Sequence, residues 1–199
     1  MIRFWRVLSL VTVLALLSGG CPVGSLPDST NPGGGSSSTS AGGATQGDQE
    51  SEDELGAAFP GCSQAADGDE WRAEVLRLVN VERERVGLSP VTHNQTLEDQ
   101  ATQYACEMIY YDFFAHENPV TGTSLDDRAA EFGYDYLMIG ENLAAGQSSP
   151  AQVMADWMAS EGHRANILQG QFTELGVGVR TGGEFQTYWV QEFGRPRNP

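Results

Sequence analysis

The chain has 199 residues, of which 40% are hydrophobic, and its 24 glycines gather toward the N-terminal third. This composition allows one compact domain with a tail. The basic residues are 11 arginines, set against 27 acidic residues, which gives a formal net charge of −16. Because binding to a phosphate backbone needs clustered cations, nucleic acid is excluded as an expected partner.

The N-terminus has the pattern of a signal peptide over residues 1–20, with two arginines ahead of an apolar stretch from Val7 to Leu17. This stretch is too short to span a bilayer. Small residues then precede Cys21, as in the bacterial lipobox, although Leu17 lies one position earlier than the usual leucine. We expect export to the cell envelope with a lipid anchor on Cys21; secretion after cleavage nearby is the alternative.

Residues 21–68 are rich in Gly, Ser, Asp and Glu and contain few large apolar residues. Such a segment cannot bury enough surface to offset the entropy that is lost on ordering. It is expected to be a disordered acidic tether between the membrane and a folded domain at residues 69–199.

Two cysteines, Cys62 and Cys106, remain if Cys21 carries a lipid. In an oxidising environment they are expected to form a disulfide, which stabilises the fold by about 4 kcal/mol in the chain-entropy model. Metal ligation is the alternative, but it lacks the support of C-x-x-C spacing.

Four helices are expected from apolar spacing and capping residues. The first ends at Gly87, and the second begins after Asn94 or Thr96, where Asn94 is more simply a helix cap than a glycosylation site. A short third helix is expected from Leu125 to Phe132. The fourth begins at Ser149–Gln152, which combines an N-cap, a proline at the first helical position and a capping-box glutamine.

The C-terminal part has the pattern of a β-hairpin. Apolar residues alternate with Gly or polar residues from Leu175 to Val179, a turn follows at Thr181–Glu184, and Phe185–Phe193 complete the hairpin. A further strand is expected at Tyr136–Ile139, ending just before Glu141. Helices first and a hairpin last indicate an α+β layered domain.

Several short segments together resemble one family. They are Leu78–Arg83, Phe114–His116, Gly140–Asn142, Trp157–Leu168, Leu175–Val179 and Tyr188–Phe193. In this order and spacing they resemble the CAP superfamily, also called SCP-like, of cysteine-rich secretory, venom-antigen and pathogenesis-related proteins, and specifically its compact bacterial branch. The resemblance covers residues 69–194 and implies a three-layer α-β-α sandwich.

Three polar residues, His116, Glu141 and His163, come from separate expected elements and are candidates for a shared cleft. Two imidazoles and one carboxylate are an acceptable three-ligand set for Zn²⁺ that leaves a position open for water. The resemblance implies such a cleft, where family members carry two His and two acidic residues that bind a divalent metal in some cases. His116 and Glu141 match that pattern directly.

The remaining family positions differ in this chain. Ser160 stands where eukaryotic members have a glutamate, and the later Gly-His-Tyr motif that supplies their second histidine is missing. In the bacterial branch His163 fills the imidazole role, with Glu161 as a candidate fourth group. Arg164 and Asn166 lie in the same segment as supporting residues.

Each of these residues also has a structural interpretation. Glu141 could cap a strand-loop junction, and His116 could satisfy a buried carbonyl. Hydrogen bonds that tie one element to another are the favoured role of three residues: Arg164, Asn166 and Asn80. The first two would tie the hairpin to a helix. His93 lies in a connection without a partner in the sequence and is expected to be exposed.

The favoured function is a surface binding module, expected to be monomeric, whose His/Glu cleft holds a lipid, peptide or protein ligand, as the resemblance allows. The chain has no G-x-S-x-G elbow, no H-E-x-x-H helix and no free Cys beside a His. One alternative is a metal-dependent hydrolase in which Zn²⁺ activates water and Glu141 is the general base. The other is a structural or adhesive envelope protein.

Overall fold

The computed structural model describes residues 54–198, so the predicted signal peptide, the lipidation of Cys21 and residues 21–53 of the predicted tether lie outside the described residues. The helices are α2 (Gly68–Arg85), α3 (Gln95–Tyr110), α4 (Leu125–Glu131), α5 (Pro150–Ala159) and α6 (Glu161–Ile167). The strands are β1 (Ser63–Gln64), β2 (Thr92–His93), β3 (Tyr136–Ala145), β4 (Glu174–Gly182) and β5 (Gln186–Pro196). Within the described part, no helix is both long and apolar enough to cross a membrane.

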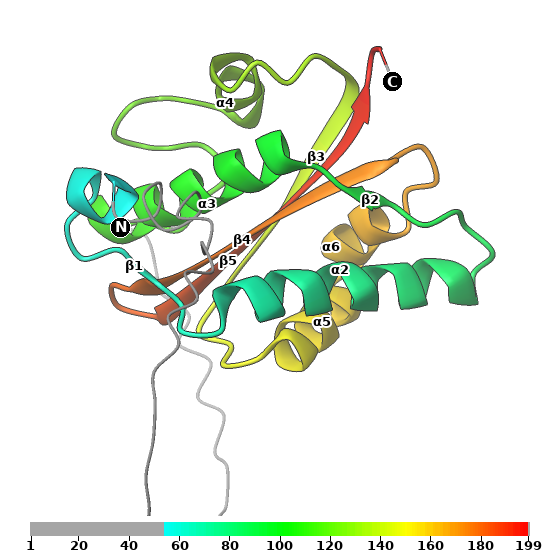
Figure 1. Cartoon of the computed structure of the whole chain (residues 1–199), viewed down its shortest axis with the longest axis horizontal. Coiled ribbons are helices and arrows are strands. Elements are labelled where there is room, and N and C mark those ends of the chain that lie inside the picture. Colours follow the sequence, from blue (N-terminus) through cyan, green and yellow to red (C-terminus); the bar gives the residue numbers. More distant parts are fainter. Residues whose placement is uncertain (1–53, 199) are drawn as a thin grey trace, which may run out of the picture. The chain divides into compact units, whose positions relative to one another are not determined.

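The strands form one sheet in the order β1-β4-β5-β3, with β2 paired in parallel to one end of β4. The β4–β5 hairpin is the predicted one, and β3 lies antiparallel to β5 at the edge of the sheet. Helices α2, α5 and α6 cover one face of this sheet, and α3 and α4 cover the other (Figure 1). The predicted α+β class and α-β-α sandwich are therefore confirmed.

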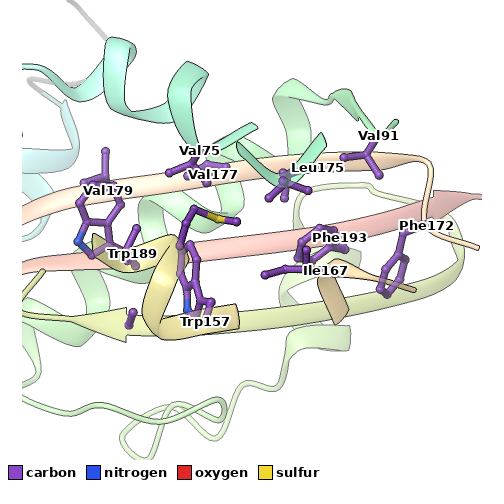
Figure 2. Close-up of a cluster of buried hydrophobic side chains, with 14 of the residues drawn as sticks. Val75, Val91, Trp157, Ile167, Phe172, Leu175, Val177, Val179, Trp189 and Phe193 are labelled. Atoms are coloured by element: carbon purple, nitrogen blue, oxygen red, sulfur yellow. The ribbon is translucent and has the colours of Figure 1, made fainter. Parts of the chain in front are cut away.

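The main core lies between the sheet and the α2/α5/α6 layer. Figure 2 shows Trp157 of α5 and Trp189 of β5 among the side chains of this core, together with Val75, Val177 and Val179. Trp71 stacks on Trp189, with the ring centroids 5.1 Å apart. A second cluster on the opposite face packs α3 against the sheet through Tyr104, Met108, Leu143 and Val190, among other residues.

Helix α3 lies unusually close to β4 because two glycines face it. A Cβ atom at Gly176 would lie 2.2 Å from the backbone nitrogen of Glu98, and one at Gly178 would lie 2.4 Å from the backbone of Ala101. No side chain fits at either position while α3 stays in place. The alternation of Gly with Leu and Val in this strand therefore sets the helix-to-sheet distance.

The predicted helix starts are present in the structure. The Asn94 side chain accepts from the backbone N–H of Leu97 at 3.1 Å, so its cap role is confirmed. Ser149 caps α5 by accepting from the N–H of Gln152. The Gln152 side chain, however, reaches the N–H of Ser148 at 3.1 Å, one residue before the N-cap, so the capping box is displaced by one position.

The structured part begins before the predicted boundary at residue 69. Cys62 and Cys106 form the predicted disulfide, with their Cα atoms 5.2 Å apart. Directly after Cys62, the short strand β1 pairs with the end of β4, matching Ser63 with Thr181. The disulfide and β1 thus fix the entry of the chain to α3 and to the sheet, and residues 62–68 belong to the domain.

Arg83 is a buried cation that the sequence did not single out. Its side chain is fully buried, and it donates to backbone carbonyls at 2.9–3.0 Å, those of Ser89, Ile167, Gln169 and Phe172. These carbonyls come from the segment after α2 and from the end of α6 and the loop that follows it. Arg83 therefore joins α2 to α6 at this end of the domain.

Candidate functional site

Glu141 lies inside β3, two residues beyond the shorter strand expected from the sequence, and its side chain is only 2% exposed. One carboxylate oxygen, Oε1, accepts from Nδ1 of His116 at 2.7 Å. The other, Oε2, accepts from Nη2 of Arg128 at 2.6 Å. Both oxygens are thus engaged by cationic or hydrogen-bonding side chains, and the structural interpretation of Glu141 as a cap for backbone N–H groups is wrong.

Arg128 is the residue of this site that sequence reasoning missed. It lies on α4, where its guanidinium sits 3.4 Å above the centre of the Tyr104 ring. It also donates to the backbone carbonyl of His116 at 3.2 Å. One side chain therefore fixes both Glu141 and the loop that carries His116. The Ser124/Asp127 capping box marks where α4 begins, but it does not single out Arg128.

His116 is presented to solvent. Its side chain is 62% exposed although Nδ1 is held by Glu141. The hydrogen bond to Glu141 raises the pKa of His116 above its ordinary value, outweighing burial and the charge of Arg128, which lower it. With Nδ1–H assigned as the donor to the carboxylate, Nε2 is the atom that faces outward. The dyad resembles the orienting pairs that carboxylates form with histidines in enzymes.

His163 approaches from the other face of the sheet. It lies in the short helix α6, and its backbone carbonyl accepts from Asn142 Nδ2 at 3.1 Å. Burial lowers the pKa of His163 below its ordinary value, and the charge of His116 lowers it further. The pKa values of the two imidazoles are therefore displaced in opposite directions.

The outer edge of β3 is closed by side chains of the α5/α6 layer. Asn166 Nδ2 donates to the carbonyl of Glu141 at 3.0 Å, and Trp157 Nε1 donates to the carbonyl of Leu143 at 3.2 Å. These carbonyls belong to alternate residues of an edge strand, so they point away from β5. The two side chains take the place of a neighbouring strand, which accounts for the Trp157-to-Asn166 spacing.

Asn166 ties one element to another by hydrogen bonds, as expected, but it ties α6 to β3, so the predicted link to the hairpin is wrong. It also donates to Asn142 Oδ1 at 2.9 Å. Arg164 donates to the Met158 carbonyl at 3.3 Å and so ties α6 to α5. Asn80 makes two hydrogen bonds with the backbone of Val91, at 2.8 and 3.0 Å, as expected for a structural residue.

The other predicted site residues are not part of this group. Ser160 precedes α6 without a capping hydrogen bond from its side chain, and Glu161 is exposed. His93 has a partner after all, because its Nε2 lies 3.0 Å from Oε2 of Glu98. The His93–Glu98 pair lines a cavity of about 310 Å³, together with Ala73, Leu76, Leu175 and Val177 among other residues.

Glu192 is a second buried carboxyl beside the site. The strand register places Glu192 directly between Glu141 and Gly176, on the face that α3 covers. Its side chain is fully buried, and neither carboxyl oxygen has a hydrogen-bond partner of normal geometry; the same holds for the nearby amide of Gln100. Burial raises the pKa of Glu192 well above its ordinary value and the charge of Glu141 raises it further, while Arg128 and Gln100 lower it less.

The predicted zinc ligands do not fit a three-ligand site in this arrangement. Among residues 54–198 no three His, Cys, Asp or Glu side chains are grouped so that they could hold a metal ion. In addition, the guanidinium of Arg128 lies 2.6 Å from Glu141 Oε2. It stands where a divalent cation would bind and already supplies the positive charge that pairs with this carboxylate. Metal binding at His116, Glu141 and His163 stays an untested prediction that the geometry disfavours.

The architecture and the site together define a class of protein. It is an α-β-α sandwich in which a glutamate on the edge strand is held by a histidine and an arginine, and a second histidine lies near the same strand. Comparison with known families is consistent with this class. The model of the cysteine-rich secretory protein family, CAP, matches residues 76–193. The chain belongs to the CAP family.

Two relatives come from Bacillus subtilis (strain 168). The uncharacterized protein YkwD is 38% identical over 123 residues, which cover 62% of this chain and 46% of YkwD. The uncharacterized membrane protein YlbC is 32% identical over 120 residues, which cover 60% of this chain and 33% of YlbC. The matched region thus spans between a third and a half of these relatives.

Solved structures agree on the fold. An extracellular protein of Bacillus anthracis str. Ames that contains an SCP domain is 31% identical, with a TM-score of 0.58, over 64% of this chain and 41% of that protein. An outer surface protein of Borrelia burgdorferi has a TM-score of 0.57 at 20% identity, over 62% of this chain and 90% of its own length, which supports the fold alone. These neighbours are extracellular or surface proteins.

Proposed function

We propose that this chain is an exported CAP-domain protein that acts as a surface binding module, with the β3 edge between His116 and His163 as its binding site. The observation that carries the proposal is the double engagement of Glu141 by His116 and Arg128. A carboxylate held in this way fixes an imidazole in one orientation and is poorly placed to serve as a general base. The site therefore favours recognition over turnover.

The chemistry of the two histidines suggests what the site binds. The raised pKa of His116 favours an imidazolium whose Nε2–H donates, and the lowered pKa of His163 favours a neutral ring that can accept. The charge of His116 influences the pKa of His163, so the two rings belong to one region at the edge of β3. A donor and an acceptor in one region can serve a peptide group, which carries one C=O and one N–H. Peptide or protein ligands are therefore favoured over lipids.

Proton NMR tests this proposal, because the chain has only three histidines. Capped tripeptides and vesicles of phosphatidylglycerol are titrated separately into the exported protein while the ring protons are followed. Saturable shifts at His116 and His163 with the peptides, and none at His93, are expected. Equal shifts of all three rings, or shifts with the vesicles alone, would contradict a peptide site.

The metal-dependent hydrolase remains the second candidate, since two histidines with oppositely shifted pKa values are also the arrangement used for acid–base catalysis. Calorimetric titration of Zn²⁺ into wild type and into the His116→Ala, His163→Ala double variant separates the two functions. Tight Zn²⁺ binding that the double variant loses would favour the hydrolase. No heat of binding in the folded wild type would remove its support. Export and the lipid anchor on Cys21 are tested by mass spectrometry of the mature N-terminus.

A further inference from the structure

The C-terminal end of α3 and the β4–β5 turn lie at the same end of the domain (Figure 1), and two exposed aromatic rings meet there. Phe114, in the loop after α3, is 45% exposed, and Phe185, in the turn, is 42% exposed. Their ring centroids are 6.1 Å apart in an edge-on arrangement, and Phe185 contacts Tyr188 at 5.7 Å. Large apolar rings that touch each other in solvent mark a surface that gains stability when it is covered.

Acidic residues flank these rings, and the cation closest to them in the sequence, His116, is paired with Glu141. Asp112 and Glu184 come from the two loops that carry the rings, and both lie close enough to the Tyr188 hydroxyl to raise its pKa, although burial has the larger effect. Residues 107–127 contain five acidic residues and no Lys or Arg, and the turn at residues 182–186 contains no basic residue. A cation is the charged group that this surface attracts.

The backbone around the rings is held in unusual conformations. In the described part of the chain, the non-glycine residues with positive φ are Asp112 (54°) and Gln186 (66°). One lies two residues before Phe114 and the other directly follows Phe185. Asp112 directly follows the C-cap of α3 and Gln186 lies at the β4–β5 turn, so these conformations fix the course of the two loops that carry the rings.

We infer that Phe114 and Phe185, with Asp112 and Glu184 beside them, form a docking surface for an arginine- or lysine-bearing segment of a partner protein. A guanidinium or ammonium group lies over an aromatic face while it pairs with a carboxylate, and the aliphatic stem of the side chain covers the rest of the ring. Arginine fits best, because its planar group can stack on a ring and pair with a carboxylate at the same time.

Other occupants fit this surface poorly. The chain has no basic residue between Arg6 and Arg72, so its own acidic N-terminal segment cannot supply the cation. A second copy of the chain would bring another acidic surface to a protein of net charge −16. An anionic membrane is repelled for the same reason. The inference goes beyond the proposed binding site at His116 and does not depend on it.

Calorimetry and fluorescence anisotropy test the inference with the exported protein. The probe is a labelled decapeptide in which arginine alternates with glycine, and the matched probes replace arginine by lysine or by glutamate. We expect saturable binding of the arginine peptide in low salt, weaker binding of the lysine peptide, and none of the glutamate peptide. No saturable binding of the arginine peptide up to millimolar concentration would overturn the inference.

Two variants separate ring stacking from diffuse electrostatics. Phe114→Ser with Phe185→Ser removes the rings and leaves every charge in place, and it is expected to weaken arginine-peptide binding at least tenfold. Leu137→Ser, at another exposed apolar residue, is the control and should bind as wild type does. Unchanged affinity in the double variant would overturn the inference in favour of unspecific attraction. Binding to phosphatidylglycerol vesicles that the double variant loses would overturn it in favour of a membrane surface.

Discussion

Replacing Glu192 by glutamine is expected to stabilise the fold, and to do so increasingly as the pH rises. The carboxyl is fully buried beside Glu141, and its pKa in the folded protein is raised well above the ordinary 4.5. Its favourable contribution is therefore complete below the pKa of the unfolded chain and is lost as the pH rises through the folded pKa. Glutamine keeps the shape and an amide that can face Gln100, and it never ionises.

The magnitude follows from this proton linkage. Over each pH unit in which the folded protein keeps the proton and the unfolded chain has released it, the wild type loses about 1.4 kcal/mol relative to the variant. Near pH 4 the two proteins should differ by no more than about 1 kcal/mol, the usual scale of a near-isosteric change. The gap should then widen from about pH 5 upward.

Urea denaturation followed by tryptophan fluorescence, at half-unit steps from pH 4 to pH 8, measures the free energy of unfolding of both proteins. Glu117→Gln, at an exposed glutamate, is the matched control and should show a gap that hardly changes with pH. A difference between wild type and Glu192→Gln that stays constant over this range would refute the argument, as would a variant that is less stable than wild type at pH 7.

Three further outcomes are expected. Glu141→Gln removes the carboxylate that raises the pKa of His116, so the NMR titration of His116 should shift to lower pH. Because the pKa of His116 is raised in the folded protein, the stability that the His116–Glu141 pair contributes is fully present below the pKa of His116 in the unfolded chain. It is lost as the pH rises through the pKa of His116 in the folded protein. Replacing Cys62 and Cys106 by serine opens a loop of 44 residues and should cost about 4 kcal/mol in urea denaturation. Gly178→Ala should cost about 3 kcal/mol or more, because the new methyl group meets the α3 backbone.

Each of these outcomes has a control. His93 serves as an internal reference in the titration, and a shift of His93 equal to that of His116 would indicate a global change. For the cysteines, titration of the unreduced wild type should find no reactive thiol from this pair, and finding two would contradict the disulfide. Gly162→Ala, on α6 with open space around the Cβ position, should be neutral or slightly stabilising. A similar loss of stability in Gly162→Ala and Gly178→Ala would contradict the close-contact argument.

The regular elements could be predicted because their signals are local. The apolar spacing of α3 and its Asn94 cap, and the Gly-Val alternation of β4, need no knowledge of the rest of the fold. The disulfide followed from the compartment and from the small number of cysteines. The full extent of β3 could not be predicted. Glu141 and Asn142 are buried polar residues whose partners come from other elements, and such residues look like a loop in the sequence.

The site could be predicted only in part for a related reason. His116 and Glu141 were expected to share a cleft, and they lie together as a hydrogen-bonded pair, but Arg128, which holds the other carboxylate oxygen, was not expected. A single arginine in a seven-residue helix gives no sequence signal, since its position over Tyr104 results from tertiary packing. Glu192 was expected on a strand. Its position beside Glu141, however, depends on the register between β3 and β5, and the alternation of apolar residues within one strand does not give that register.

The side chains that close the outer edge of β3 also have a consequence for aggregation. An open edge strand offers unpaired carbonyls to any other chain that can add a strand, which is a common route to aggregation. Asn166 and Trp157 occupy the carbonyls of Glu141 and Leu143 before another chain can do so. The segment that carries the family signature thus also protects this edge of the sheet, and weakening it should first appear as self-association.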